Sequence, residues 1–159
     1  MIPNIEFKET MSLIPTSVGV VWLNSNNNQK IGCTISSFIS VSVTTDSEVI
    51  AFVLKGDSRT AKILSEVGSF QIAILNQRQS EIAKIFSSSF PVDQLNEALL
   101  GYPSWVENAV CWFKLSVRKT FPVNDTVMFM ADVKGYGYNV GSEPLIYSSR
   151  SYSGVATLG

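Results

Sequence analysis

The chain of 159 residues contains no histidine. This absence excludes Ser-His-Asp and Cys-His catalysis, metal sites built on imidazole, and the usual proton shuttle of neutral pH. The two cysteines, Cys33 and Cys111, cannot supply the about four ligands of a structural zinc site, so we expect no metal. An enzyme with this sequence must use chemistry that needs no imidazole.

Charge and long apolar runs are also scarce. Charged residues make up 16% of the chain and the formal net charge is −1, without a basic cluster, which argues against nucleic-acid binding. No apolar run approaches the roughly 18 residues that span a bilayer, and Met1–Glu9 has neither a basic start nor an apolar run. We therefore expect no membrane segment, no leader and a cytoplasmic protein with two reduced thiols.

What is present fits one domain over residues 1–159. Hydrophobic residues make up 45% of the chain, enough for a substantial core and for apolar surface that a second copy would cover. Alternating or continuous apolar runs predict strands, and helical spacing with caps predicts short helices. The expected strands are 18–23, 31–43, 49–54, 70–75, 113–118 and 127–134, and the expected helices are 7–14, 61–68, 77–86 and 93–100.

Local signals refine this pattern. Asp57 or Ser58 would cap the helix that Gly68 ends, and Asn76 with Gln79 resembles a capping box. The segment 135–159 is rich in Gly, Tyr and Ser, and we expect it to be half ordered. Because the strands follow one another through hairpins, the sequence predicts a mainly β fold with short helices, built as a small antiparallel barrel.

The stretch Gly32–Val43 carries short hydroxyl side chains where a solvated strand would more often carry Lys, Glu or Gln. Two interpretations stay open for it. The first is an ordinary strand with a ladder of Ser and Thr. The second is a wall that lets a flat or phosphorylated molecule approach the backbone, with donors available to meet it.

A second feature is Ser58-Arg59-Thr60 at the expected start of a helix. Free N–H groups and the helix dipole favour an anion there, and Arg59 adds a forked cation, although Ser58 and Thr60 taken alone are ordinary caps. A phosphate site and a hydroxyl-lined strand in one small barrel suit a phosphorylated planar cofactor. Flavin mononucleotide (FMN) is such a molecule.

These residues resemble the flavin reductase-like family, the FMN-binding split barrels of two-component monooxygenases. The family strand Gly-x-Thr-x-Ser-Ser-Phe-x-Ser-Val-Ser is matched at every fixed position by residues 32–42. Ser58-Arg59-Thr60 matches the family's Ser-x-Thr, and Leu75, Gln79 and Phe86 keep its later spacing. Pro144-Leu145-Ile146-Tyr147 with Tyr152 resembles its final motif, so the resemblance runs from about Met11 to Tyr152.

The resemblance implies a homodimeric antiparallel split β-barrel of Greek-key type that binds FMN, or FAD, near the subunit interface. It implies NADH or NADPH as reductant and a flavin-dependent monooxygenase as partner. By similarity, Thr34, Ser36 and Ser37 would face the flavin ring and ribityl chain. Ser58, Arg59 and Thr60 would hold the phosphate, and Phe86 would lie near the rim of the groove.

The sequence departs from the family where the nicotinamide is expected. At Asp125-Thr126 a threonine replaces the family's frequent histidine, and Ala131, Ser148 and Ala73 replace a frequent Gly, His and Asn. Two main hypotheses follow: an NAD(P)H:flavin oxidoreductase that transfers hydride to flavin N5, or a flavin-binding electron carrier or store without reductase activity. A barrel without cofactor that serves only as a dimeric interaction module is a third.

Overall fold

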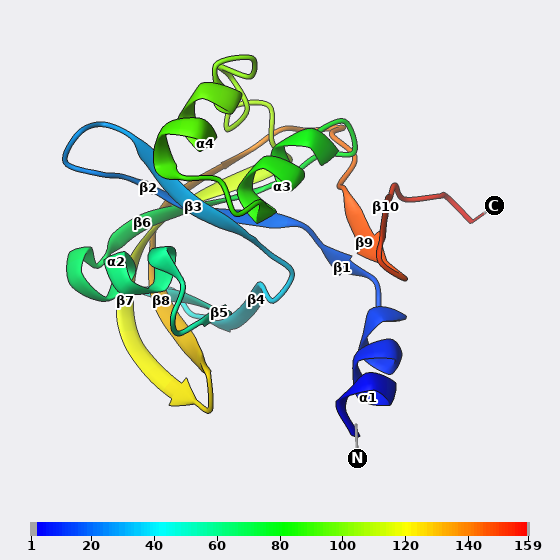
Figure 1. Cartoon of the computed structure of the whole chain (residues 1–159), viewed down its shortest axis with the longest axis horizontal. Coiled ribbons are helices and arrows are strands. Elements are labelled where there is room, and N and C mark those ends of the chain that lie inside the picture. The colour runs from blue at the N-terminus through cyan, green and yellow to red at the C-terminus, as the bar shows by residue number, and fades with distance from the viewer. Residues whose placement is uncertain (1–2, 159) are drawn as a thin grey trace.

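The structure is a computed structural model that describes residues 3–158. It is mainly β, with one seven-stranded antiparallel sheet, one three-stranded sheet and four helices among the described residues (Figure 1). In chain order the elements are α1 (Pro3–Ser12), β1 (Thr16–Ser17), β2 (Gly19–Asn24), β3 (Lys30–Ile35), β4 (Ile39–Val43), β5 (Glu48–Lys55), α2 (Arg59–Val67), β6 (Ser69–Ile74), α3 (Ser80–Ser87), α4 (Val92–Leu99), β7 (Cys111–Val123), β8 (Thr126–Tyr138), β9 (Ile146–Ser148) and β10 (Ser151–Ser153).

The large sheet has the order β3-β2-β6-β7-β8-β5-β4, and the small sheet has the order β1-β9-β10. Apolar side chains fill both faces of β2, because Val21 and Leu23 belong to one core cluster whereas Val20 and Trp22 belong to another. The first cluster packs under α2 and contains the stacked rings of Phe52 and Phe129, with centroids 5.3 Å apart. The second lies under α3 and α4, which cover β2 and β3 in Figure 1.

The predicted single strand over residues 31–43 is wrong, because the chain leaves the sheet at Ser36–Phe38. β3 and β4 are consecutive in the chain yet lie at opposite ends of the sheet order. Ile39 pairs with Ala51, so a continuing ladder would place Ser37 opposite Val53. Instead, the Ser37 hydroxyl accepts the Val53 N–H at 2.9 Å and donates to the Val53 C=O at 3.3 Å, so a side chain replaces the missing backbone partner.

The capping signals are confirmed for α2 and modified for α3. Ser58 is the N-cap of α2 and accepts the Ala61 N–H at 3.1 Å, and Gly68 ends the helix with φ of 79°. The Gln79 side chain accepts the Asn76 N–H at 3.0 Å, as a capping box requires. However, α3 begins only at Ser80, so Gln79 precedes the helix instead of standing inside it.

The two ends of the chain differ from the sequence predictions. α1 covers Pro3–Ser12 in place of 7–14, and the side chains of residues 4–11 remain exposed because the helix stands away from the large sheet (Figure 1). An ion pair of 2.7 Å from Arg150 to Glu9 ties α1 to the β9–β10 hairpin. The expected half-ordered tail contains the end of β8 together with β9 and β10. Within residues 3–158, no helix combines the length and hydropathy that crossing a membrane requires.

Candidate functional site

A cavity of about 710 Å³ opens where the link from β3 to β4 passes the end of β5, the start of α2 and the end of α3. It contains five of the seven residues that the sequence predicted to bind a cofactor. These are Thr34, Ser36, Ser37, Ser58 and Phe86. Its other lining residues are Cys33, Ile35, Val53, Leu54, Lys55, Ser87 and Ser88, which the sequence did not single out as cavity residues.

The fold already uses two of the three hydroxyls that were predicted to face a ring. Thr34 Oγ1 donates to the Ala83 C=O at 2.7 Å and so ties β3 to α3. Ser37 is engaged with Val53. Within residues 3–158, no hydrogen bond occupies the Ser36 hydroxyl or the N–H groups of 36–38. Between β3 and β4, the free donors at Ser36–Phe38 are therefore the exposed Ser36 hydroxyl and three backbone N–H groups.

The cavity reaches the start of α2 at Ser58, the N-cap of that helix, and Arg59 and Thr60 follow just outside its lining. The Ser58 side chain caps the Ala61 N–H, while the N–H groups of Arg59 and Thr60 have no partner in the described part of the chain. Together with the helix dipole, these N–H groups favour a bound anion. Lys55, which also lines the cavity, adds a positive charge at this end.

Arg59 and Thr60 occupy different positions from those the motif predicts. The Arg59 side chain is exposed and donates to the Phe90 C=O at 3.4 Å, outside the cavity lining. The Thr60 side chain is only 2% exposed and lies in the interior beside Cys33, so it offers a bound anion its backbone N–H alone. Direct phosphate contacts by either side chain remain predictions.

Cys33 lines the cavity as a free thiol, and Cys111 is free as well. Burial raises the pKa of the Cys33 thiol, and the neighbouring Thr60 hydroxyl offsets part of the rise. The thiol is therefore protonated at neutral pH and packs as a small apolar group instead of acting as a nucleophile. Residues 3–158 contain no group of three or more potential metal ligands.

Asp125 and Thr126, the predicted nicotinamide-side residues, lie at the tip of the β7–β8 hairpin. The Asp125 C=O accepts the Gly56 N–H at 2.8 Å, and the Thr126 hydroxyl donates to the Val123 C=O at 2.7 Å. Thr126 pairs with Lys55, which places both residues near the α2 end of the cavity without making them part of its lining. Their role stays a prediction.

A second, smaller hollow of about 260 Å³ adjoins the cavity. The two share Thr34, Ile35, Ser36 and Ser87. Tyr147 and Tyr152 close the smaller hollow, with ring centroids 5.2 Å apart. The sequence indicated the two tyrosines only as parts of the final family motif. No local pattern predicts that the β9–β10 hairpin lies beside β3.

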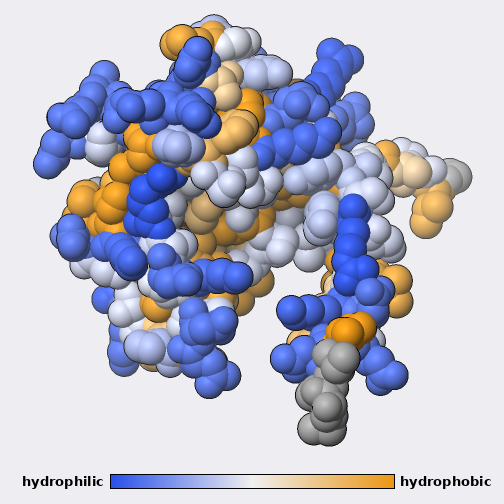
Figure 2. Space-filling view, viewed as in Figure 1, coloured by the Kyte–Doolittle hydropathy of each residue, from blue (hydrophilic) through white to orange (hydrophobic). Residues whose placement is uncertain are grey.

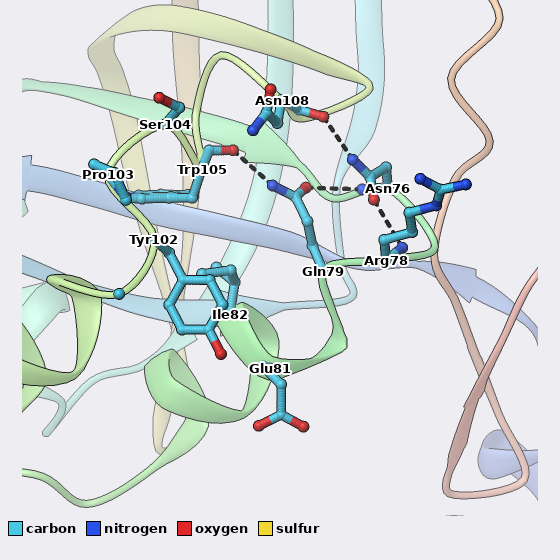
Figure 3. Close-up of a pocket in the computed structure, with 11 residues that line it drawn as sticks. Asn76, Arg78, Gln79, Glu81, Ile82, Tyr102, Pro103, Ser104, Trp105 and Asn108 are labelled. Atoms are coloured by element: carbon cyan, nitrogen blue, oxygen red, sulfur yellow. Dashed lines mark hydrogen bonds between the residues drawn. The ribbon is translucent and has the colours of Figure 1, made fainter.

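A third hollow, of about 690 Å³, lies at the other end of α3 (Figure 3). Its amide side chains are largely engaged with each other and with the backbone: Gln79 Nε2 donates to the Trp105 C=O at 2.7 Å, and Asn76 Nδ2 donates to the Asn108 C=O at 2.6 Å. These bonds tie the start of α3 to the 102–108 loop. We therefore assign the polar groups of this hollow to the fold and place the candidate site at the first cavity.

A family model described as a flavin reductase like domain matches residues 11–156. The chain belongs to this family. The flavin reductase-like chain is 26% identical to the NADH-dependent flavin reductase StyB of Pseudomonas fluorescens, over 93% of this chain and 88% of that protein. It is also 26% identical to the NADH-dependent FMN reductase AsuE2 of Streptomyces nodosus subsp. asukaensis, over 93% of this chain and 83% of that protein.

The fold agrees with this membership. The structure of the styrene monooxygenase flavin reductase (SMOB) of Pseudomonas putida S12 superimposes with a TM-score of 0.82. That comparison covers 96% of this chain and 99% of the other, at 23% identity. The mainly β, antiparallel architecture is thus that of a flavin reductase-like domain, as the sequence predicted.

Proposed function

We propose that this protein is an NAD(P)H-dependent flavin oxidoreductase that binds FMN, or FAD, in the cavity between β3, β5, α2 and α3. The observation that carries the proposal is that one cavity is lined both by Ser36 and Ser37, whose N–H groups are free in the described part of the chain, and by Ser58, the N-cap of α2. The chain belongs to a family in which two relatives at 26% identity are named NADH-dependent reductases of flavin and of FMN.

The residues present fit such a cofactor. The volume of about 710 Å³ lies within the range of small-molecule sites, about 300–1,000 Å³. Apolar groups of Ile35, Leu54 and Phe86 offer a surface for a flat ring, and the free donors of Ser36 and Ser37 match the polar edge of a flavin. The free N–H groups at the start of α2 would suit the phosphate at the end of the ribityl chain.

When bound, the flavin accepts a hydride at N5 from a dihydronicotinamide. The contribution of this chain would be to bind the flavin, to orient it toward the reductant and to polarise its ring. The donors of Ser36 and Ser37 would stabilise negative charge on the polar edge of the ring, and the N–H groups of α2 would hold the phosphate. No side-chain base takes part, so the absence of histidine is compatible with this reaction.

The competing candidate is a flavin carrier or store, which the departures at Ala73, Thr126, Ala131 and Ser148 favour. Steady-state NADH and NADPH oxidation with added FMN or FAD separates the two. Turnover well above a protein-free control supports the reductase. A protein that binds flavin, shown by quenching of FMN fluorescence, yet bleaches no faster than free flavin under anaerobic NADH would be a carrier.

We further infer a homodimeric split barrel of Greek-key type. The consecutive strands β3 and β4 end opposite edges of the large sheet, and Ser37 links the β3–β4 crossing to β5, which supports a curled, incompletely closed sheet. Apolar side chains stand exposed on α1, at Ile14 just after it, and on β4, and a second copy would cover them. They are Phe7, Met11, Ile14, Ile39, Val41 and Val43. Figure 2 shows a few orange residues on the mainly blue surface of α1. A stable monomer in sedimentation at micromolar concentration would contradict the dimer.

Two wider assignments rest on the same proposal. Reduced flavin would pass to a partner monooxygenase, which the name of the structurally similar styrene monooxygenase flavin reductase supports. The free state of Cys33 and Cys111 supports a reducing, cytoplasmic location. Coupled oxygenation by a candidate oxygenase, with and without this protein, tests the first assignment.

Arg59→Ala is expected to weaken FMN binding about three- to tenfold and riboflavin binding hardly at all, because only FMN carries a phosphate. The effect is modest because the guanidinium is exposed and must turn from the Phe90 C=O to reach the anion. Fluorescence titration with both ligands measures it, with the exposed Lys134→Ala as a charge-matched control. An equal loss of affinity for FMN and for riboflavin would show that Arg59 does not bind the phosphate.

A further inference from the structure

The hollow closed by Tyr147 and Tyr152 continues beyond Tyr152. Tyr152 also lines a neighbouring hollow of about 360 Å³, whose other members include Gln77, Arg78 and Ser80. Since the first of these hollows shares Thr34, Ile35, Ser36 and Ser87 with the cofactor cavity, a connected series of depressions runs from that cavity toward the start of α3. The series is a path along the surface for an elongated molecule.

Arg78 stands at the far end of this path. It lines the 360 Å³ hollow, a further one of about 220 Å³ and the large hollow of Figure 3. Within residues 3–158, no ion pair or hydrogen bond holds its guanidinium, in contrast to Arg118 and Arg150, which pair with Asp132 and Glu9. Figure 3 shows the guanidinium turned away from the hydrogen-bonded cluster of Asn76, Gln79 and Asn108.

The charged residues that line these hollows are Lys55 in the cofactor cavity and Arg78 at the far end, with Glu143 beside Arg78 in the hollow of about 220 Å³. Burial and then the neighbouring Tyr147 raise the pKa of the Tyr152 hydroxyl, whereas the Lys84 ammonium lowers it. Tyr152 is therefore neutral at pH 7 and its hydroxyl can donate a hydrogen bond. The one carboxylate on α3, Glu81, is paired with Lys84 at 3.1 Å. An anion that follows the path thus meets an unpaired guanidinium at its end.

The length of the path suits a dinucleotide. α3 runs from the Arg78 end to Ser87 at the cofactor cavity, and its eight residues span about 12 Å. A nicotinamide ring next to the flavin would fill the hollow of Tyr147 and Tyr152, and the rest of the molecule would extend along α3. The diphosphate of the reductant would then come within reach of the long Arg78 side chain.

We propose that Arg78 is the residue of this chain that recognises the diphosphate of the dinucleotide reductant. The inference rests on the proposed reductase function. Arg78 is a binding residue and makes no contact with the reacting atoms, because it lies at the end of α3 opposite the cofactor cavity. It is expected to act on the affinity for the reductant and to leave hydride transfer itself unchanged.

The test compares two reductants on the FMN-loaded protein: NADH, which carries the diphosphate, and 1-benzyl-1,4-dihydronicotinamide, which carries no phosphate. Arg78→Ala is expected to raise KM for NADH about five- to tenfold with little change in kcat. The kinetics with the phosphate-free reductant and the Kd for FMN should stay unchanged. Arg78→Lys should restore part of the loss, and Lys134→Ala, which removes an exposed charge outside these hollows, should behave as wild type.

Binding of ADP-ribose, measured by calorimetry, gives a readout without turnover, and Arg78→Ala should weaken it by a similar factor. An unchanged KM for NADH, or an equal effect on both reductants, would overturn the assignment of Arg78. Failure of the reductase function has a different signature, since the wild-type protein would then oxidise neither reductant faster than free flavin does. In that case unaltered ADP-ribose binding in Arg78→Ala would overturn the inference independently.

Discussion

A Gly32→Ala variant is expected to melt well below the wild-type protein and to lose most of its affinity for flavin. An added Cβ at Gly32 would lie 2.3 Å from the Val21 carbonyl oxygen and 3.1 Å from the Phe86 ring. Val21 belongs to a paired strand in the sheet interior, so its backbone cannot retreat cheaply. Overpacking of this kind costs about 1–3 kcal/mol or more.

At about 3 kcal/mol, the melting temperature of a domain of this size falls by roughly 6–12 °C. Thermal melts followed by circular dichroism measure the change, and an FMN fluorescence titration at a temperature where both proteins are folded measures the affinity. Gly101→Ala is the matched control, because the nearest atom to its added Cβ is 4.0 Å away. Equal melting temperatures for the two variants would contradict the close approach at Gly32.

Phe86→Ala is expected to have the largest effect of the single substitutions that we consider. The Phe86 side chain is 2% exposed, and its ring packs 5.1 Å from that of Trp105 while also lining the flavin cavity. Truncation to alanine at such a buried position costs about 3–5 kcal/mol, because the surrounding core collapses only partly into the space. The same change removes part of the cavity wall, so flavin affinity should fall about tenfold or more.

Two further variants separate stability from binding. Phe90→Ala removes the same ring from a position that is 39% exposed, and it should cost far less stability. Phe86→Leu keeps much of the volume and should retain most of the stability while still weakening flavin binding. The measurements are urea denaturation and FMN titration of all three proteins. A Phe86→Ala protein as stable as Phe90→Ala would show that the ring is not a core contact.

The sequence predicted best those features that neighbouring residues determine. The caps of α2 illustrate this, because Ser58 and Gly68 act on atoms a few residues away, and both operate as predicted. The buried strand β2 was likewise recognisable from its own apolar run. By contrast, the α1 boundaries were shifted, since that helix packs on no core that would fix its spacing.

The candidate site was predictable in its residue types and less so in their use. The hydroxyl-rich motif and the start of α2 do meet in one cavity. Composition could not reveal that the Thr34 and Ser37 hydroxyls are hydrogen-bonded to the backbone of Ala83 and Val53. It also could not reveal that the Thr60 side chain is buried in the core. Those bonds join residues far apart in the chain, so they depend on how the elements are placed.

By itself, the sequence determined the family motif of residues 32–42, the approximate positions of most strands of the large sheet, and the helix start at Ser58. Only the tertiary structure decided that the hydroxyl-rich stretch is broken between β3 and β4, that the Tyr152 hollow adjoins this break at Ser36, and that the Arg78 hollow follows beyond Tyr152. The physical reason is that these features depend on contacts between segments far apart in the chain. Side-chain alternation is the same on both sides of Ser36–Phe38, whereas strand pairing is a contact between distant segments.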